Sequence, residues 1–190
     1  TALGATDGFN GTASAIANGF SNINTLVGGN GSDTLAGVNA NATWNILGAN
    51  NGNYVNTNTL TFSAIDNLVG GSGVDTISYS TYATSVVVNL TLGTATDLTS
   101  ISAIENVIGG SGNDTITVDT STNILSGGAG DDTYKFNNGW GADTVVDSAG
   151  NDTLDFSAVT SALTFNFNGA SVSGGGNTVS YGNIENFVGG

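Results

Sequence analysis

A short motif of glycines and one aspartate recurs along the chain and limits what the chain can fold into. Each copy reads as an apolar segment, then Gly-Gly-x-Gly-x-Asp, then an apolar residue two positions after the aspartate. Copies cover residues 23–35, 65–77 and 104–116, and a shorter copy covers 184–190. Their first glycines stand at positions 28, 70, 109 and 189, which gives a period near forty with one copy skipped. A repeated period of this kind is typical of a solenoid, in which each coil packs only on its neighbours.

Related turns occupy the place of the skipped copy. The segment Gly127–Asp132 repeats the motif about half a period after the copy at Gly109, and Gly150–Asp152 is a weaker relative. Other glycine- and asparagine-rich turns fall between the strong copies, so each period of about forty residues holds two coils of about twenty. We therefore expect about nine coils in the chain.

Composition favours strands over helices. The sequence contains 30 glycines in 190 residues, no Met and one basic residue, and its acids are mainly Asp. Good helix formers are thus rare. Short apolar clusters such as Val86-Val87-Val88, separated by Gly, Asn and Asp, follow the pattern of strands and turns. The prediction is an all-β fold, a parallel β-solenoid of the β-roll or β-helix kind. We expect residues 20–190 to form one solenoid, and residues 1–19 are an unplaced segment or cap.

The charge of the chain excludes several functions. The net charge is −14, and Lys135 is the only basic residue. A chain with one cation cannot neutralise a phosphate backbone, so we expect no nucleic-acid partner. No apolar run is long enough to span a bilayer, so we expect no membrane insertion. The absence of Cys and His removes thiolate and imidazole chemistry.

The repeated motif combines groups that bind a hard cation. Glycines allow a tight turn that directs backbone carbonyls inward, and the aspartate adds a carboxylate beside them. Such oxygens are the ligands that Ca²⁺ prefers. A metal-free turn is the alternative interpretation, and it weighs most at Asp33 and Asp75, whose copies have no tandem neighbour.

At these residues the chain resembles the repeat-in-toxin (RTX) family of secreted bacterial proteins, whose nonapeptides form a calcium-filled parallel β-roll. The resemblance is closest at residues 109–117 and 127–135, which are offset by two nonapeptides, the length of one β-roll turn. It implies that these two loops share Ca²⁺, with further copies standing elsewhere in the chain. The candidate metal residues are Gly110, Gly112, Asp114, Gly128, Gly130 and Asp132, together with Asp33, Asp75 and Asp152.

The resemblance and the composition together lead us to expect a structural role. The favoured interpretation is an extracellular or cell-surface bacterial protein, stabilised by Ca²⁺, that builds a filament, surface layer or adhesin stalk. Its partner would be another copy bound head-to-tail, or the continuation of a longer solenoid. The alternative is an accessory RTX domain of a secreted enzyme that serves secretion or contacts polysaccharide. We expect no enzymatic activity, because paired acids such as Asp131 and Asp132 are more typical of ligands than of a glycosidase.

Overall fold

The structure is a computed structural model that describes residues 2–3, 9–13 and 16–190. Every regular element in these ranges is a β-strand, so the predicted all-β class is confirmed for this part of the chain. Chain contacts divide the protein into two compact units, and each is described by itself. Unit 1 contains residues 1–78 and 97–104, and unit 2 contains residues 79–96 and 105–190. Residues 1–19, predicted as a segment or cap, lie partly outside the described residues.

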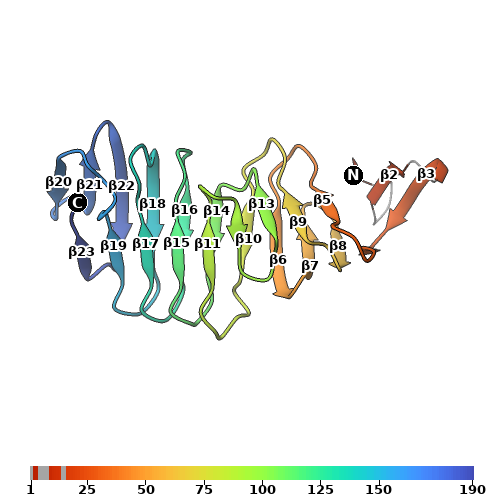
Figure 1. Cartoon of the computed structure of the whole chain (residues 1–190), viewed down its shortest axis with the longest axis horizontal. Coiled ribbons are helices and arrows are strands. Elements are labelled where there is room, and N and C mark those ends of the chain that lie inside the picture. Colours follow the sequence, from red (N-terminus) through yellow and green to blue (C-terminus); the bar gives the residue numbers. More distant parts are fainter. Residues whose placement is uncertain (1, 4–8, 14–15) are drawn as a thin grey trace. The chain divides into compact units, whose positions relative to one another are not determined.

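Unit 2 consists of short strands, most of them stacked in parallel (Figure 1). One sheet has the order β12-β11-β15-β17-β19-β23, and the other strands follow the order β20-β21-β22-β18-β16-β14. The bounds in the first sheet are Thr94–Ala95, Val87–Asn89, Thr115–Thr117, Thr133–Lys135, Thr153–Asp155 and Asn186–Val188. Those in the second are Leu163–Asn166, Ser171–Gly174, Asn177–Gly182, Ala142–Val146, Ile124–Ser126 and Asn106–Ile108.

The register of these strands follows the repeat. Thr115 pairs with Thr133, and Thr133 pairs with Thr153, so each strand pairs with the strand one coil further along the chain. The opposite strands advance in the same way, from Val107 to Leu125 and from Leu125 to Val145. Parallel strands one coil apart are consistent with the predicted β-roll. The coil length of about twenty residues holds for these strands, whereas the pairings of β11 with β15, β18 with β22 and β19 with β23 span longer coils.

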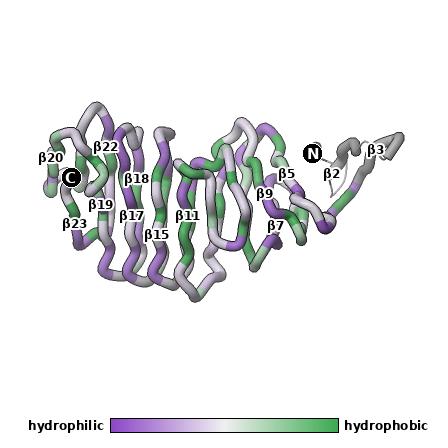
Figure 2. The backbone as a smooth tube through the Cα atoms, in the orientation of Figure 1, coloured by the Kyte–Doolittle hydropathy of each residue, from purple (hydrophilic) through white to green (hydrophobic). Residues whose placement is uncertain are grey.

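The core of unit 2 is thin. The middle residue of each short strand points inward, and Ile116, Tyr134 and Leu154 are each no more than 1% exposed. Phe136 stacks on Phe156 with ring centroids 4.6 Å apart. Hydrophilic residues gather at the turns of this unit, whereas its strands alternate in character (Figure 2). Each coil therefore buries one narrow apolar row against its neighbours, as a repeat architecture requires.

Unit 1 has longer coils. Its parallel sheet β5-β9-β13 contains Thr34–Ala36, Asn67–Val69 and Ser100–Ser102, and in it Thr34 pairs with Asn67 and Asn67 with Ser100. Both pairings join residues 33 apart, so both coils exceed the expected length of about twenty. An antiparallel hairpin series lies within the first of them. The series β6-β7-β8 covers Thr43–Gly48, Asn51–Val55 and Thr59–Ser63. The count of nine coils is therefore not confirmed and stays a prediction.

The remaining strands of unit 1 extend the same pairing. Strand β4 (Thr25–Val27) pairs in parallel with β8, and β10 (Thr76–Ser78) pairs in parallel with β6. Strands β1 (Ala2–Leu3), β2 (Phe9–Ala13) and β3 (Ile16–Ile23) form an antiparallel sheet. The buried side chain of Trp44 packs on Tyr54, with centroids 4.4 Å apart, and contacts Phe62 at 6.1 Å.

The turns of unit 2 stack so closely that glycine is required in them. A Cβ atom at Gly128 would lie 2.1 Å from the carbonyl oxygen of Gly110 in the preceding turn, and one at Gly130 would lie 2.6 Å from that of Gly112. Gly128 also has a φ of 108°, a conformation that side chains rarely adopt. Backbone atoms of one turn thus contact backbone atoms of the next, with no side chain between them.

We expect Gly128→Ala to lower the free energy of unfolding by about 3 kcal/mol, because the new methyl group meets a backbone carbonyl and the conformation is strained. The matched control is Gly176→Ala, where φ is 86° but no described atom lies within 4 Å. It should cost about 1 kcal/mol. Urea unfolding followed by circular dichroism measures both values. Equal losses in the two variants would contradict close stacking of the turns.

Candidate metal centre

The aspartates of successive nonapeptide turns stack on one another. Asp114, Asp132 and Asp152 each directly precede a strand of the parallel sheet, so the strand register brings them side by side. The backbone N–H of Asp114 donates to Asp132 Oδ1 at 2.6 Å, and that of Asp132 donates to Asp152 Oδ1 at 2.8 Å. The N–H of Asp152 donates in turn to Glu185 Oε2 at 2.9 Å. One oxygen of each acid therefore links two coils.

The first glycine of each turn makes room for the other carboxylate oxygen. A Cβ atom at Gly127 would lie 2.0 Å from Asp132 Oδ2, and one at Gly109 would lie 2.2 Å from Asp114 Oδ2. At Asp114 this oxygen accepts the N–H of Gly110 at 2.7 Å. At Asp132 and Asp152 the Oδ2 atom is buried and finds no hydrogen-bond partner among the described residues. Buried oxygens in this state are costly unless they gain a proton or a cation.

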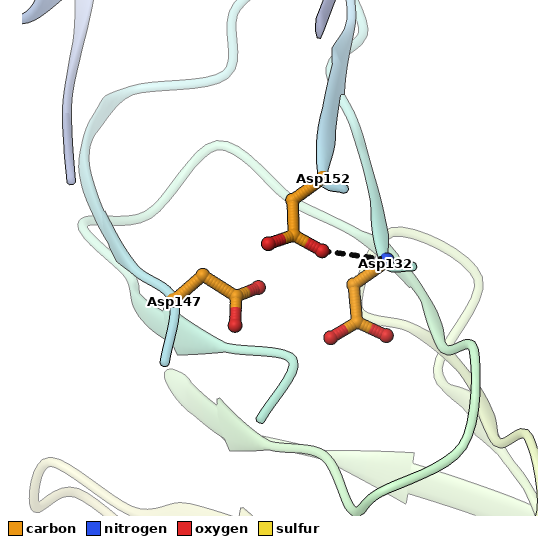
Figure 3. A group of neighbouring side chains, drawn as sticks. All are labelled: Asp132, Asp147 and Asp152. Atoms are coloured by element: carbon orange, nitrogen blue, oxygen red, sulfur yellow. Dashed lines mark hydrogen bonds between the residues drawn. The ribbon is translucent and has the colours of Figure 1, made fainter. Parts of the chain in front are cut away.

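A third carboxylate joins these two. One oxygen each from Asp132, Asp147 and Asp152 lies within 4.8 Å of the others, and the three residues are 1 to 2% exposed. Figure 3 shows the three side chains converging on one space. Oxygens bound to Ca²⁺ at 2.3–2.6 Å from opposite sides would stand about 5 Å apart. The separation therefore fits a divalent cation held between the three acids.

Burial in this cluster disfavours the charged carboxylates. The pKa of Asp132 is raised from 3.8 to about 7, mainly by desolvation. The neighbouring acids Asp147, Asp114 and Asp152 contribute to this rise, and a backbone hydrogen bond opposes it. Desolvation is also the main cause that raises the pKa values of Asp114 and Asp152. A bound cation would reverse this preference, because it stabilises the charged forms.

The glycines predicted as carbonyl ligands take part in the turn stack. The carbonyl oxygen of Gly110 accepts the N–H of Ala129 at 3.0 Å, and that of Gly128 accepts the N–H of Ala149 at 3.2 Å. Gly112 and Gly130 face one another closely. The structure thus places these four glycines beside Asp114 and Asp132 in one stack, where their hydrogen bonds join neighbouring turns.

The two candidates in unit 1 have different surroundings. Asp33 is half-buried, and its Oδ2 atom accepts the N–H of Gly29 at 2.7 Å. Its own N–H donates to Asp66 Oδ2 at 2.9 Å. Asp75 is fully buried, and its Oδ2 atom lies 2.8 Å from where a Cβ of Gly70 would stand. Calcium binding at Asp33 and Asp75 therefore stays a prediction, as does the alternative of a metal-free turn.

The sequence predicted Asp132 and Asp152 but not Asp147, which stands where the motif has its first glycine. A second group was also missed, formed by Asn123 directly before β16 and Asp143 near the start of β18. Asn123 donates its N–H to Asp143 Oδ1 at 2.9 Å, while Asn123 Oδ1 and Asp143 Oδ2 are buried without partners in the described part of the chain. The sequence Asp143-Thr144-Val145 could have indicated this group, because it has the same order of Asp, Thr and buried residue as Asp132-Thr133-Tyr134. Desolvation raises the pKa of Asp143 to about 7, with a smaller contribution from Asp119.

Comparison with known families agrees with this geometry. The model of the RTX calcium-binding nonapeptide repeat matches four times, at residues 18–37, 61–78, 102–134 and 137–155. The chain carries RTX calcium-binding repeats. The third match covers the turns of Asp114 and Asp132, and the fourth covers Asp143, Asp147 and Asp152. The predicted resemblance is thereby confirmed. No curated protein matches the chain.

We expect the metal-free RTX chain to lose stability as the pH rises. The pKa values of Asp132 and Asp143 are about 7 in the folded state and near 3.8 when unfolded. Their stabilising effect is complete below about pH 4 and is lost as the pH rises through about 7. Urea unfolding in excess chelator across this range measures the trend. Asp143→Asn should make the decrease shallower, whereas stability that is constant or rises with pH would contradict the raised pKa values.

Proposed function

We propose that this chain is an extracellular structural module whose RTX fold is completed by Ca²⁺. The observation that carries the proposal is the cluster of Asp132, Asp147 and Asp152, in which two buried carboxylate oxygens have no partner among the described residues. No basic side chain neutralises the negative charge of these carboxylates, because Lys135 is the only basic residue in the sequence and lies exposed on β17. A divalent cation from solution would do so.

Because Ca²⁺ binds the folded chain and not the unfolded one, its binding free energy adds to the stability of the fold. The three acids come from two different coils, and the strand register brings them together, so an unfolded chain cannot present them as one site. Ca²⁺ then stabilises the fold in proportion to the logarithm of its concentration above the dissociation constant. We propose that the chain stays unfolded where Ca²⁺ is scarce inside the cell, and folds after export. Asp114 and the four glycines of the turn stack would provide oxygens for a further ion at the neighbouring turn.

We propose a structural role, as a filament, surface-layer or adhesin building block of about nine coils, and the form of unit 2 supports it. Strand β23 lies at the end of its sheet, so one of its backbone edges has no strand partner within the described ranges. An aromatic cluster of Phe165, Phe167 and Phe187 lies at this end, and Phe167 is 70% exposed. We propose that a second copy of the chain docks on this end, head-to-tail, and that no catalytic role is involved.

A second candidate function is an accessory module that holds polysaccharide for a secreted enzyme. A groove of about 560 Å³ crosses the outward face of β11, β15, β17 and β19 in unit 2. Lys135, Asp155, Asn89 and Thr117 line it together with Leu92. Hydroxyl, amide and charged groups around an open groove are able to bind sugar hydroxyls.

Among the described residues no helix is long and apolar enough to cross a membrane.

The calcium role is tested by Asp132→Asn combined with Asp152→Asn. In the unaltered chain, millimolar Ca²⁺ should raise the midpoint of thermal unfolding, with a gain of about 3 kcal/mol at one hundred times the dissociation constant. The double variant should lose most of this gain, because it removes two of three buried charges. Asp131→Asn with Asp155→Asn changes the net charge equally outside the cluster and should keep it. A double variant that still responds fully to Ca²⁺ would contradict this site.

Assembly is tested by negative-stain electron microscopy with Ca²⁺ and with excess chelator. We expect fibres only with Ca²⁺, and we expect Phe167→Ser to shorten or abolish them, because it removes an exposed aromatic contact. The control is Leu92→Ser, which changes a 73% exposed apolar side chain elsewhere in unit 2. Fibres in both conditions would keep the structural role and reduce the part played by the metal. Discrete particles in both would favour the accessory module.

A further inference from the structure

The metal cluster departs from the nonapeptide at one position. The bridge between Ala129 and Ala149 sets the register of two neighbouring turns, and at this register Asp147 corresponds to Gly127. Asp147 therefore occupies the place of the first glycine. A Cβ atom at Gly127 would point at the carboxylate of its own turn, 2.0 Å from Asp132 Oδ2. A side chain at this position is thus directed towards the cluster, and here it is an acid.

Tyr134 holds this acid in place. Its hydroxyl donates to Asp147 Oδ2 at 2.5 Å and accepts the backbone N–H of Gly127. The other oxygen, Asp147 Oδ1, accepts the N–H of Ser148 at 2.5 Å. Both carboxylate oxygens therefore have a donor that fixes the rotation of the group. The pairing does not depend on solvent, because Tyr134 is fully buried and Asp147 is 2% exposed.

The hydroxyl is specific to this coil. In the sheet register Tyr134 lies between Ile116 and Leu154, and the motif places an apolar residue at each of these positions. A phenol ring fills the apolar row as its neighbours do, but it also carries one donor to the end of the strand stack.

We propose that Asp147 is a third carboxylate ligand for a divalent cation, that Tyr134 is its positioning residue, and that this site fills before the turn at Asp114. The inference rests on the proposed calcium binding. Affinity for Ca²⁺ rises with the number of charged ligands and with the rigidity of the site. The Asp114 turn has glycine at the corresponding position, Gly109, and so has no third acid from its own turn. A residue that orients a ligand typically affects metal affinity about 10- to 100-fold.

The experiment measures Ca²⁺ affinity by titration calorimetry in the full chain and in Tyr134→Phe and Asp147→Gly. Asp147→Gly restores the family motif and so keeps the turn compatible with folding. The control for Tyr134→Phe is Tyr79→Phe, since Tyr79 is also fully buried and donates its hydroxyl to the carbonyl of Thr96 at 2.6 Å. Luminescence of Tb³⁺, bound in place of Ca²⁺ and excited through tyrosine, reports whether the ion lies near the Tyr134 ring.

We expect the tightest dissociation constant to rise about 10-fold or more in Tyr134→Phe and in Asp147→Gly, and to stay within about twofold in Tyr79→Phe. Tyrosine-excited Tb³⁺ emission should fall in Tyr134→Phe beyond the loss explained by weaker binding. If the unaltered chain binds Ca²⁺ but both variants bind it equally well, the inference is wrong, and the proposed function still stands on the test of Asp132→Asn with Asp152→Asn. If the unaltered chain binds no Ca²⁺, both are wrong. A lower melting temperature in Tyr134→Phe with unchanged affinity would assign Tyr134 a packing role only, which also overturns the proposal.

Discussion

Close stacking of the turns in unit 2 is the constraint on which the rest of the structure depends. Gly110 and Gly128 bring consecutive turns within backbone contact, so no side chain separates them. Because each turn ends in an aspartate, the same stacking that closes the fold also places Asp132 and Asp152 side by side away from water. In this architecture the turns therefore cannot stack without burying carboxylates. The cost of burying the acids has to be offset by protons or by a cation.

The two oxygens of each stacked aspartate have different roles. One oxygen accepts a backbone N–H from the preceding coil and so acts as part of the coil-to-coil hydrogen bonding. The other faces the cluster, and at Asp132 and Asp152 it has no partner in the described part of the chain. The backbone register alone can thus bring the coils together, but the electrostatic balance is completed from solution. This division explains how one residue type can be both a structural element and a metal ligand, and why its pKa is sensitive to burial.

Much of this arrangement could be predicted from the sequence, because the motif and its register are local properties. The offset of two nonapeptides between the turns of Asp114 and Asp132 predicted the strand pairing that the structure shows. The coils of unit 1 could not be predicted in the same way, since β6, β7 and β8 pair antiparallel within a coil and lengthen it. Asp147 was missed because it replaces a glycine of the motif. Its role depends on the Tyr134 hydroxyl, whose direction no pattern of residue types contains.

The most direct test of the calcium account is a crystal structure of the full chain grown with Ca²⁺, with anomalous scattering used to locate the ion. The account predicts an anomalous peak between Asp132, Asp147 and Asp152, with at least one oxygen of each residue at about 2.3–2.6 Å from it. It would be contradicted by a structure in which these three carboxylates keep their positions with only water or protons between them, while Ca²⁺ binds elsewhere or not at all.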